Sequence, residues 1–155
     1  LNQHGKKVHI AIDPYGSIEY EHKEGEFVRL DYTNEMRDEC LMNLYAYTRQ
    51  LQIPFIFFNL EDTEFFNRYG DGVPVYAHEK KIWNTYSFVH YDGPHAVKPL
   101  LAEIDFFLPR TPIGGCWVFD DIKGYYDHDA IEEVLFEKGF ILIEKGDKKA
   151  LYQKS

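Results

Sequence analysis

The sequence predicts an α/β fold in which helices cover a mostly parallel β-sheet and an antiparallel hairpin ends the chain. Two observations predict it. Short apolar runs alternate with longer segments whose apolar residues recur every three to four positions, which is the pattern of alternating strands and helices. Near the C-terminus, two apolar runs flank Lys145-Gly146-Asp147-Lys148, a sequence typical of a hairpin turn. We expect one domain over residues 1–155, with about six strands and four helices.

The strands are expected where apolar runs stop at turn-forming residues. They are residues 8–12, 55–58, 86–91, 116–119, 140–144 and 150–153. The run Phe-Ile-Phe-Phe at 55–58 is apolar at every position, which suits a central parallel strand. Residues 17–32 fit no element, and residues 70–85 are expected to form a loop.

Four helices are expected between these strands. The first begins at an N-cap of Thr33 or Asn34 and keeps one face apolar, with Met36, Cys40, Leu41, Leu44, Thr48 and Leu51. The second and third cover residues 61–68 and 97–108. The fourth ends at Lys138, just before Gly139. Asp129, with Glu132 three residues later, resembles a capping box for this last helix.

The composition excludes several classes of function. Of the 155 residues, 45% are hydrophobic and 17% aromatic, which is enough for a packed core. The net charge of -9 argues against a nucleic-acid partner, because phosphate binding requires a basic surface. No apolar run approaches the ~20 residues of a membrane span, and no signal peptide is visible. We therefore expect a cytoplasmic protein whose Cys40 and Cys116 remain thiols.

Acidic residues follow three predicted strands where each one ends. They are Asp13, Asp92 and the pair Asp120-Asp121. Parallel strands bring their carboxyl ends to one edge of a sheet, where ligands bind in open α/β folds. Clustered carboxylate oxygens suit Mg²⁺, which would offset their repulsion. A single strand-end carboxylate suits the hydroxyl groups of a ribose. His95, at the start of the helix after Asp92, is placed to act as a general base.

Each of these residues also has a purely structural interpretation. An aspartate before Gly or Pro commonly forms a turn, and adjacent aspartates often end a strand. His95 can be an ordinary residue at a helix start. The other histidines show no metal-ligand spacing and receive no role; they are His4, His9, His22, His78, His90 and His128. Acids at three separate strand ends, taken together, favour a functional site.

Four segments resemble a known family. They are VHIAIDPYG, YSFVHYDGPHAVKPLLAEIDFFLPR, GGCWVFDDI and GFILIEKGDKKALYQK. In that order, they resemble the second, fourth, fifth and last strands of class I methyltransferases, which use S-adenosylmethionine (SAM) and have a Rossmann-like sheet. The resemblance is to the group with a D-G-x-H motif after the fourth strand and a D-D pair after the fifth. That group includes Mg²⁺-dependent sugar O-methyltransferases and cephalosporin-hydroxylase-like proteins.

The resemblance implies a cofactor site. Asp13 would hold the ribose hydroxyls of SAM, and Glu61 and Asp62, which follow the third strand, would lie near its adenine. The methyl group would pass in line from the sulfonium to an oxygen of a small, sugar-like acceptor.

The resemblance also implies a metal site and a base. Asp92, Asp120 and Asp121 would ligate Mg²⁺, which would lower the pKa of the acceptor hydroxyl and fix its direction. His95 would take the proton from that hydroxyl.

One part of the family pattern has no counterpart. The family's first strand, with the Gly-rich loop that follows it, lies in the sheet between the second and fourth strands. Only twelve residues precede Asp13, and Gly5 is the one glycine among them. Three explanations stay open: the natural N-terminus lies upstream of Leu1, another segment fills the gap, or the sheet is rearranged and does not bind SAM.

The favoured function is therefore a Mg²⁺-assisted, SAM-dependent O-methyltransferase. One alternative is a non-catalytic Rossmann-like module that serves as a structural or interaction part of a larger assembly. Another is a metal-dependent hydrolase or hydroxylase. The aromatic residues of 69–91 and 117–126 could line an acceptor pocket, although core packing is their more common use. The segment 70–86 is the candidate interface of a homo-oligomer.

Overall fold

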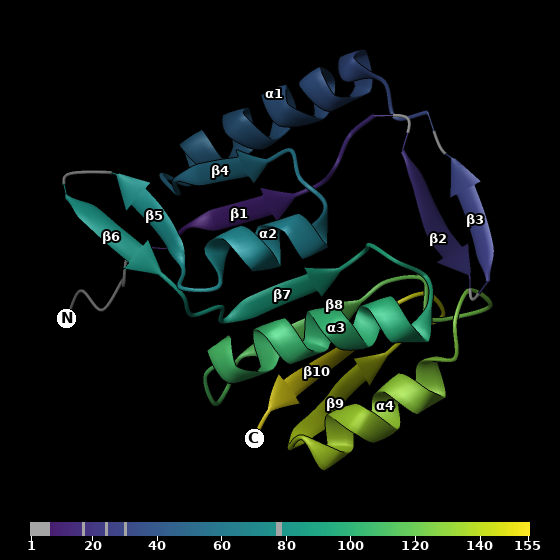
Figure 1. Ribbon diagram of the computed structural model, residues 1–155. Coiled ribbons are helices and arrows are strands. Elements are labelled where there is room, and N and C mark those ends of the chain that lie inside the picture. Colours follow the sequence, from purple (N-terminus) through teal and green to yellow (C-terminus); the bar gives the residue numbers. More distant parts are fainter. Residues whose placement is uncertain (1–6, 17, 24, 30, 77–78) are drawn as a thin grey trace. The chain divides into compact units, whose positions relative to one another are not determined.

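The computed structural model describes residues 7–16, 18–23, 25–29, 31–76 and 79–155 (Figure 1). The chain divides into two compact units. Unit 1 contains the residues up to Glu19 together with Arg29–Arg68, and unit 2 contains Tyr20–Val28 together with Tyr69–Ser155. The fold contains both helices and strands, so the α/β class is confirmed. The described strands form four small sheets with parallel and antiparallel pairs, whereas a single, mostly parallel sheet was expected.

Unit 1 is built around a strand–helix–strand arrangement. Strands β1 (His9–Ile12) and β4 (Phe55–Phe58) pair in parallel, and helix α1 (Asn34–Gln50) lies between them in the chain. A parallel pair requires such a crossover because its strands run in the same direction. Helix α2 (Asp62–Tyr69) follows β4. The ring of Phe65, which is fully buried, contacts Phe58 with 5.2 Å between ring centroids.

Helix α1 begins and packs largely as predicted. Thr33 is the N-cap, and its side chain accepts a hydrogen bond from the N–H of Met36 at 3.3 Å. Thr48 is buried, and its hydroxyl donates to the carbonyl of Leu44 at 2.7 Å. Met36 and Leu51, at the two ends of the predicted apolar face, are about half exposed. The cause is length, because the 17-residue helix spans about 25 Å and a four-residue strand only about 13 Å.

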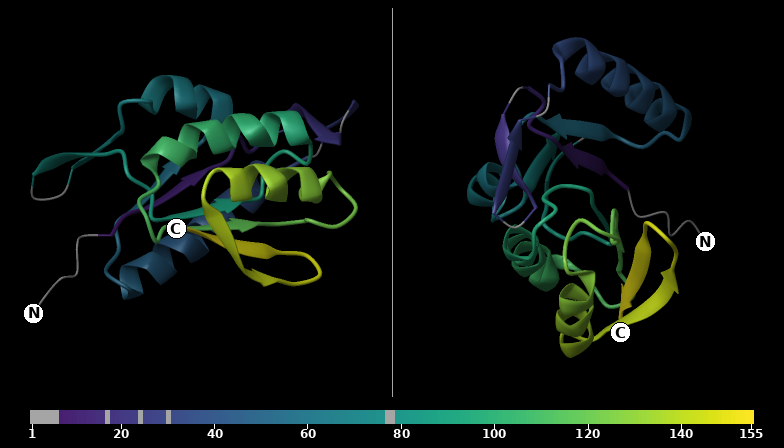
Figure 2. Two further views of the ribbon diagram at one scale, coloured as in Figure 1. Left: turned by 90° about the horizontal axis from the view of Figure 1, so that it is seen from below. Right: turned by 90° about the vertical axis from the view of Figure 1, so that its right-hand side faces the viewer.

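Unit 2 contains the largest sheet, in the order β7-β8-β10-β9. Its strands are β7 (Phe88–Tyr91), β8 (Cys116–Phe119), β9 (Phe140–Lys145) and β10 (Ala150–Lys154). Strands β7 and β8 are parallel, and β10 is antiparallel to both β8 and β9. Helices α3 (Val97–Phe107) and α4 (His128–Glu137) lie side by side on one face of this sheet (Figure 2). A short 3₁₀ turn, η1 (Leu108–Arg110), follows α3.

The core of unit 2 lies between this sheet and the two helices. Trp117, Phe119 and Tyr152 are fully buried, and Tyr91 stacks on Phe119 with 4.4 Å between ring centroids and 6° between ring planes. Strand β8 alternates half-buried and buried residues, so its aromatic side chains point to the helix side. This packing fixes where β7 and β8 end, and therefore where the residues after them emerge.

Two regions of the chain differ from the prediction. Residues 70–85 contain an antiparallel pair, β5 (Val73–Tyr76) and β6 (Lys80–Trp83), rather than a loop. Strands β2 (Glu19–Lys23) and β3 (Glu26–Arg29) form a two-stranded sheet in the unassigned segment. Pro74 in one pair and the many charged residues of the other obscure the apolar alternation that predicts strands. The described residues therefore form ten strands instead of six.

The capping residue of α4 is also different from the predicted one. The N-cap is Asp127, whose carboxylate accepts a hydrogen bond from the N–H of Ala130 at 3.2 Å. Asp129 lies inside the first turn, and its carboxylate is 3.5 Å from Nζ of Lys145. Glu132 accepts a hydrogen bond from the hydroxyl of Tyr152 instead of completing a capping box. The two acids are two residues apart, so the sequence permits either start.

The pairing of β1 and β7 concerns the strand of the family pattern for which the sequence has no counterpart. Among the described strands, β1 pairs with β4 alone and β7 pairs with β8 alone. The terminal hairpin of β9 and β10 is confirmed. Within the described part of the chain, no helix is long and apolar enough to cross a bilayer.

Candidate functional site

The strand-end acids of unit 2 emerge together, as the sequence predicted. Tyr91, the last residue of β7, lies opposite Phe119, the last residue of β8. The N–H of Asp120 donates to the carbonyl of Tyr91 at 2.9 Å, which extends the parallel ladder by one residue. Asp92 and Asp120 therefore leave neighbouring strands at the same edge, which is where open α/β sheets place their ligands.

The structure sorts the candidate ligands into two groups. Within each group, the ligand atoms lie within 4.8 Å of one another. One group contains His90, Asp92 and Asp120, and the other contains Asp92, His95 and Asp121. Asp92, Asp120 and Asp121 were expected to share one metal ion. Among the described residues, Asp92 belongs to both groups, whereas Asp120 and Asp121 belong to one each. Each group also includes an imidazole.

The backbone separates the two neighbouring aspartates. Asp121 has a φ of 49°, in the left-handed region that aspartate enters more readily than most residues. Its N–H donates to Oδ1 of Asp120 at 2.9 Å. Oδ2 of Asp121 lies 3.3 Å from Nε2 of His95, whereas Oδ2 of Asp120 lies 3.7 Å from Nε2 of His90. The tight turn after β8 therefore assigns each aspartate to a different histidine.

A lysine of the chain lies on the Asp120 side of the site. Nζ of Lys149 donates to Oδ2 of Asp120 and lies 3.4 Å from Nε2 of His90. Lys149 comes from the turn between β9 and β10. This ammonium group offsets part of the repulsion that was expected among the strand-end aspartates.

The two aspartates that end the strands have pKa values shifted in opposite directions. Desolvation, together with the charge of Asp120, raises the pKa of Asp92. Desolvation also acts to raise the pKa of Asp120, but hydrogen bonds from Lys149 and from the backbone of Asp121 outweigh it and lower that pKa. Asp92 is therefore the less compensated of the two carboxylates, and a bound cation would stabilise its charge more.

Two tyrosines surround these groups. The hydroxyl of Tyr126 donates to the backbone carbonyl of Asp120 at 3.2 Å. Burial, followed by the charges of Asp120 and Asp121, raises the pKa of Tyr126, so it remains a neutral donor at neutral pH. The ring of Tyr125 lies 4.9 Å from the ring of His95, centroid to centroid. These contacts restrict how the loop after β8 and the His95 side chain can move.

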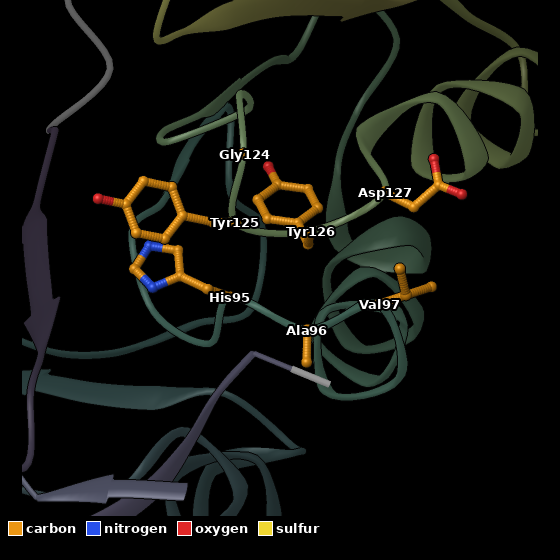
Figure 3. Close-up of a pocket in the computed structure, with 7 residues that line it drawn as sticks. All are labelled: His95, Ala96, Val97, Gly124, Tyr125, Tyr126 and Asp127. Atoms are coloured by element: carbon orange, nitrogen blue, oxygen red, sulfur yellow. The ribbon is translucent and has the colours of Figure 1, made fainter. Parts of the chain in front are cut away.

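A cavity of about 380 Å³ opens beside His95 (Figure 3). Its lining consists of His95, Ala96, Val97, Gly124, Tyr125, Tyr126 and Asp127. The volume falls within the range of small-molecule sites, about 300–1,000 Å³. Tyr125 and Tyr126, from the aromatic-rich segment 117–126, line this cavity, whereas Tyr91, Trp117 and Phe119 belong to the core.

A second, much smaller space lies among the candidate ligands. Its volume is about 10 Å³, and its lining consists of Tyr91, Asp92, Gly93, Pro94, His95, Leu100, Asp120 and Tyr126. A single water molecule requires a space of this order. It is therefore large enough for one small ion and too small for an organic ligand.

The residues expected to bind SAM follow the two strands of unit 1's parallel pair. The N–H of Asp13 donates to the carbonyl of Phe58 at 3.1 Å, so Asp13 stands at the carboxyl end of β1 beside the end of β4. Asp62 is the first residue of α2, and Glu61 directly precedes it. The carboxylate of Asp62 accepts a hydrogen bond from the N–H of Thr63 at 2.6 Å. Asp62 thus has a structural role at the helix start, and Gly5 lies outside the described residues.

Sequence reasoning missed two residues of the site, His90 and Lys149. His90 is two residues before Asp92 on a strand, so the period of two that places side chains on one face could have revealed it. Lys149 reaches the site only because β10 pairs with β8. Tyr126 belongs to the segment 117–126, whose aromatic residues were considered for a pocket lining, but its hydrogen bond to the Asp120 carbonyl was not predicted. His4 and His78, which received no role, lie outside the described residues.

The fold and the site together define a mixed α/β protein with an Asp/His cluster at the carboxyl ends of adjacent parallel strands. Neither the models of protein families nor the curated proteins contain a match to this sequence.

Proposed function

We propose that this chain belongs to the Rossmann-like class I methyltransferases and contributes to metal-assisted O-methylation of a small hydroxylated, sugar-like acceptor, with SAM as the methyl donor. One observation carries the proposal. Asp92, His95 and Asp121 bring their ligand atoms within 4.8 Å of one another at the ends of parallel strands. His95 also borders the cavity of about 380 Å³.

The donor set suits a divalent cation. Carboxylate oxygens suit Mg²⁺ and Mn²⁺, and an imidazole nitrogen also accommodates Mn²⁺ and other transition ions. Asp92 and Asp121 are the residues that would hold it. A cation there would lower the pKa of an acceptor hydroxyl.

His95 is the residue proposed to accept the hydroxyl proton. Its Nε2 lies 3.3 Å from Oδ2 of Asp121, a contact that orients the ring. The side chain of His95 also lines the cavity in which the acceptor would bind. The aromatic rings of Tyr125 and Tyr126 offer an apolar face and hydroxyl groups, a combination that suits a sugar-like molecule.

The proposed cofactor residues are those of unit 1. Asp13 stands at the end of a parallel strand, where a carboxylate can accept hydrogen bonds from ribose hydroxyls. Glu61, beside the start of α2, is exposed and is the less specific of the proposed contacts.

One observation favours a second candidate, a non-catalytic module of the same descent. In the family, a first strand lies between the second and the fourth. The corresponding strands here, β1 and β7, each pair with a single described neighbour. A module of this kind would keep the fold without binding SAM.

Isothermal titration of the purified chain with S-adenosylhomocysteine separates the two candidates. We expect micromolar binding that weakens at least tenfold in Asp13→Ala, because that variant lacks the proposed ribose ligand. The titration should be repeated with and without Mg²⁺. Asp31→Ala is the matched control, since Asp31 is an exposed aspartate of the same unit.

Each outcome selects one function. Binding that Asp31→Ala retains and Asp13→Ala loses supports the methyltransferase. No heat from a sample whose circular dichroism shows a folded protein would reject it in favour of the non-catalytic module. Equal binding by both variants would reject Asp13 as the ribose ligand.

A further inference from the structure

Lys149 occupies a position that the proposed chemistry does not explain. Its ammonium group makes a hydrogen bond with Asp120, next to the carboxylates proposed to bind a divalent cation. The side chain is 53% exposed, whereas the Asp120 side chain is 14% exposed. The lysine therefore approaches the site from solvent and covers a carboxylate that is otherwise largely enclosed.

The fold holds this lysine in place from two sides. The N–H of Gly146 donates to the carbonyl of Lys149 at 2.8 Å, which closes the turn between β9 and β10. The N–H of Ile122 donates to the carbonyl of Lys148 at 3.0 Å, which ties the turn to the segment after β8. Because Asp120 precedes that same segment, the ammonium and the carboxylate are positioned by one set of backbone contacts.

We propose that Lys149 is a built-in counter-ion that neutralises Asp120 and directs a divalent cation to Asp92 and Asp121, beside His95. The inference rests on the metal site of the proposed function and on no other part of it. Oδ2 of Asp120 cannot bind both the ammonium and a metal ion at full strength. In the group of His90, Asp92 and Asp120, the ammonium of Lys149 therefore takes the place of a metal ion. Asp92 and Asp121 remain available to bind one.

This arrangement sets the affinity of the site. A positive charge a few ångströms from a divalent ion repels it, and at an effective dielectric constant of about 20 that repulsion corresponds to at least a tenfold change in affinity. Lys149 therefore keeps metal binding weaker than the number of carboxylates suggests. It acts as a positioning residue that sets where the metal binds and how tightly.

The test is the binding of Mn²⁺ to the whole chain, measured from the free-ion signal by electron paramagnetic resonance. Lys149→Met is expected to bind Mn²⁺ about tenfold more tightly than the unmodified protein. Lys148→Met is the matched control, because it removes the same charge from the neighbouring residue and Lys148 forms no ion pair with another described residue. It is expected to change the affinity less than twofold.

Other outcomes overturn the inference. Equal Mn²⁺ affinities in Lys149→Met and Lys148→Met would show that only overall charge matters. Weaker binding in Lys149→Met would show that the lysine supports the site by structure alone. If Lys149→Met does not fold, Lys149→Gln provides the same comparison with a hydrogen-bond donor retained. Absence of Mn²⁺ binding in every variant rejects this inference together with the metal site, whereas the titration with S-adenosylhomocysteine tests the cofactor site separately.

Discussion

At the scale of single residues, the turn after β8 decides what the acidic pair can do. Asp120 and Asp121 are adjacent in sequence and chemically identical. The positive φ of Asp121 turns its side chain toward His95, while Asp120 pairs with Lys149. A non-glycine residue in the left-handed region is uncommon, and such positions occur often at functional sites. The two aspartates therefore have different partners, and their substitutions should have different effects.

This difference predicts unequal effects for matched substitutions. Asp121→Asn is expected to weaken Mn²⁺ binding at least tenfold, because it removes the negative charge of a proposed ligand. Asp120→Asn is expected to weaken it less than threefold, because Lys149 already neutralises that carboxylate. Asparagine tolerates the left-handed conformation, so both variants should fold. A larger loss in Asp120→Asn, measured by the same resonance signal, would show that the metal displaces Lys149.

At the scale of secondary-structure elements, a buried hydrogen-bond chain joins α4 to the sheet. The hydroxyl of Tyr152 on β10 lies 2.8 Å from Nε2 of His128 and donates to Oε2 of Glu132 at 2.6 Å. Nζ of Lys145 on β9 lies 3.3 Å from the same Glu132 oxygen. Burial, followed by the charge of Lys145, lowers the pKa of His128, so its ring is neutral at neutral pH. These contacts orient α4 and the loop that leads to it.

These hydrogen bonds predict that the hydroxyl of Tyr152 stabilises the fold. Tyr152→Phe should lower the free energy of unfolding by about 1–3 kcal/mol, because it leaves buried His128 without its Nε2 partner. Urea unfolding followed by circular dichroism measures the change. Tyr76→Phe is the control, since Tyr76 is 73% exposed and should change stability by less than about 0.5 kcal/mol. Similar values for the two variants would show that the buried chain contributes nothing to stability.

At the scale of the whole molecule, the two units differ in how their strands are supported. Strands β8 and β10 each pair on both edges, within a four-stranded sheet. Strands β1 and β4 form a sheet of only two strands. Two-stranded sheets have little stability of their own and depend on packing against helices. Local opening should therefore be easier in the β1–β4 pair.

Hydrogen exchange measured by mass spectrometry tests this difference. Amides of β8 and β10 are expected to exchange at least about tenfold more slowly than those of β1 and β4. The reason is that opening β8 or β10 breaks two ladders and exposes the core around Trp117. Equal protection in all four strands would show instead that the described chain opens as one cooperative structure.

The difference between what was and was not predicted follows from the range of the interactions. Apolar runs and caps act over a few residues, so they identified β1, α1, β4, α3, β8 and the terminal hairpin. The rule that parallel strands end at one edge was enough to gather Asp92 and Asp120. The β5–β6 pair was missed because Pro74 and exposed lysines interrupt its pattern. The N-cap of α4 was misplaced because two acids two residues apart compete for one position.

By itself, the sequence determined the mixed α/β class and the position of acids at strand ends, because both depend on local periodicity and on the residues that stop a strand. Only the tertiary structure decided how those acids divide. The left-handed turn at Asp121 and the pairing of β10 with β8, which brings Lys149 to Asp120, join residues up to 29 positions apart. Such contacts leave no periodic signal, since they depend on where the backbone turns and which strands become neighbours.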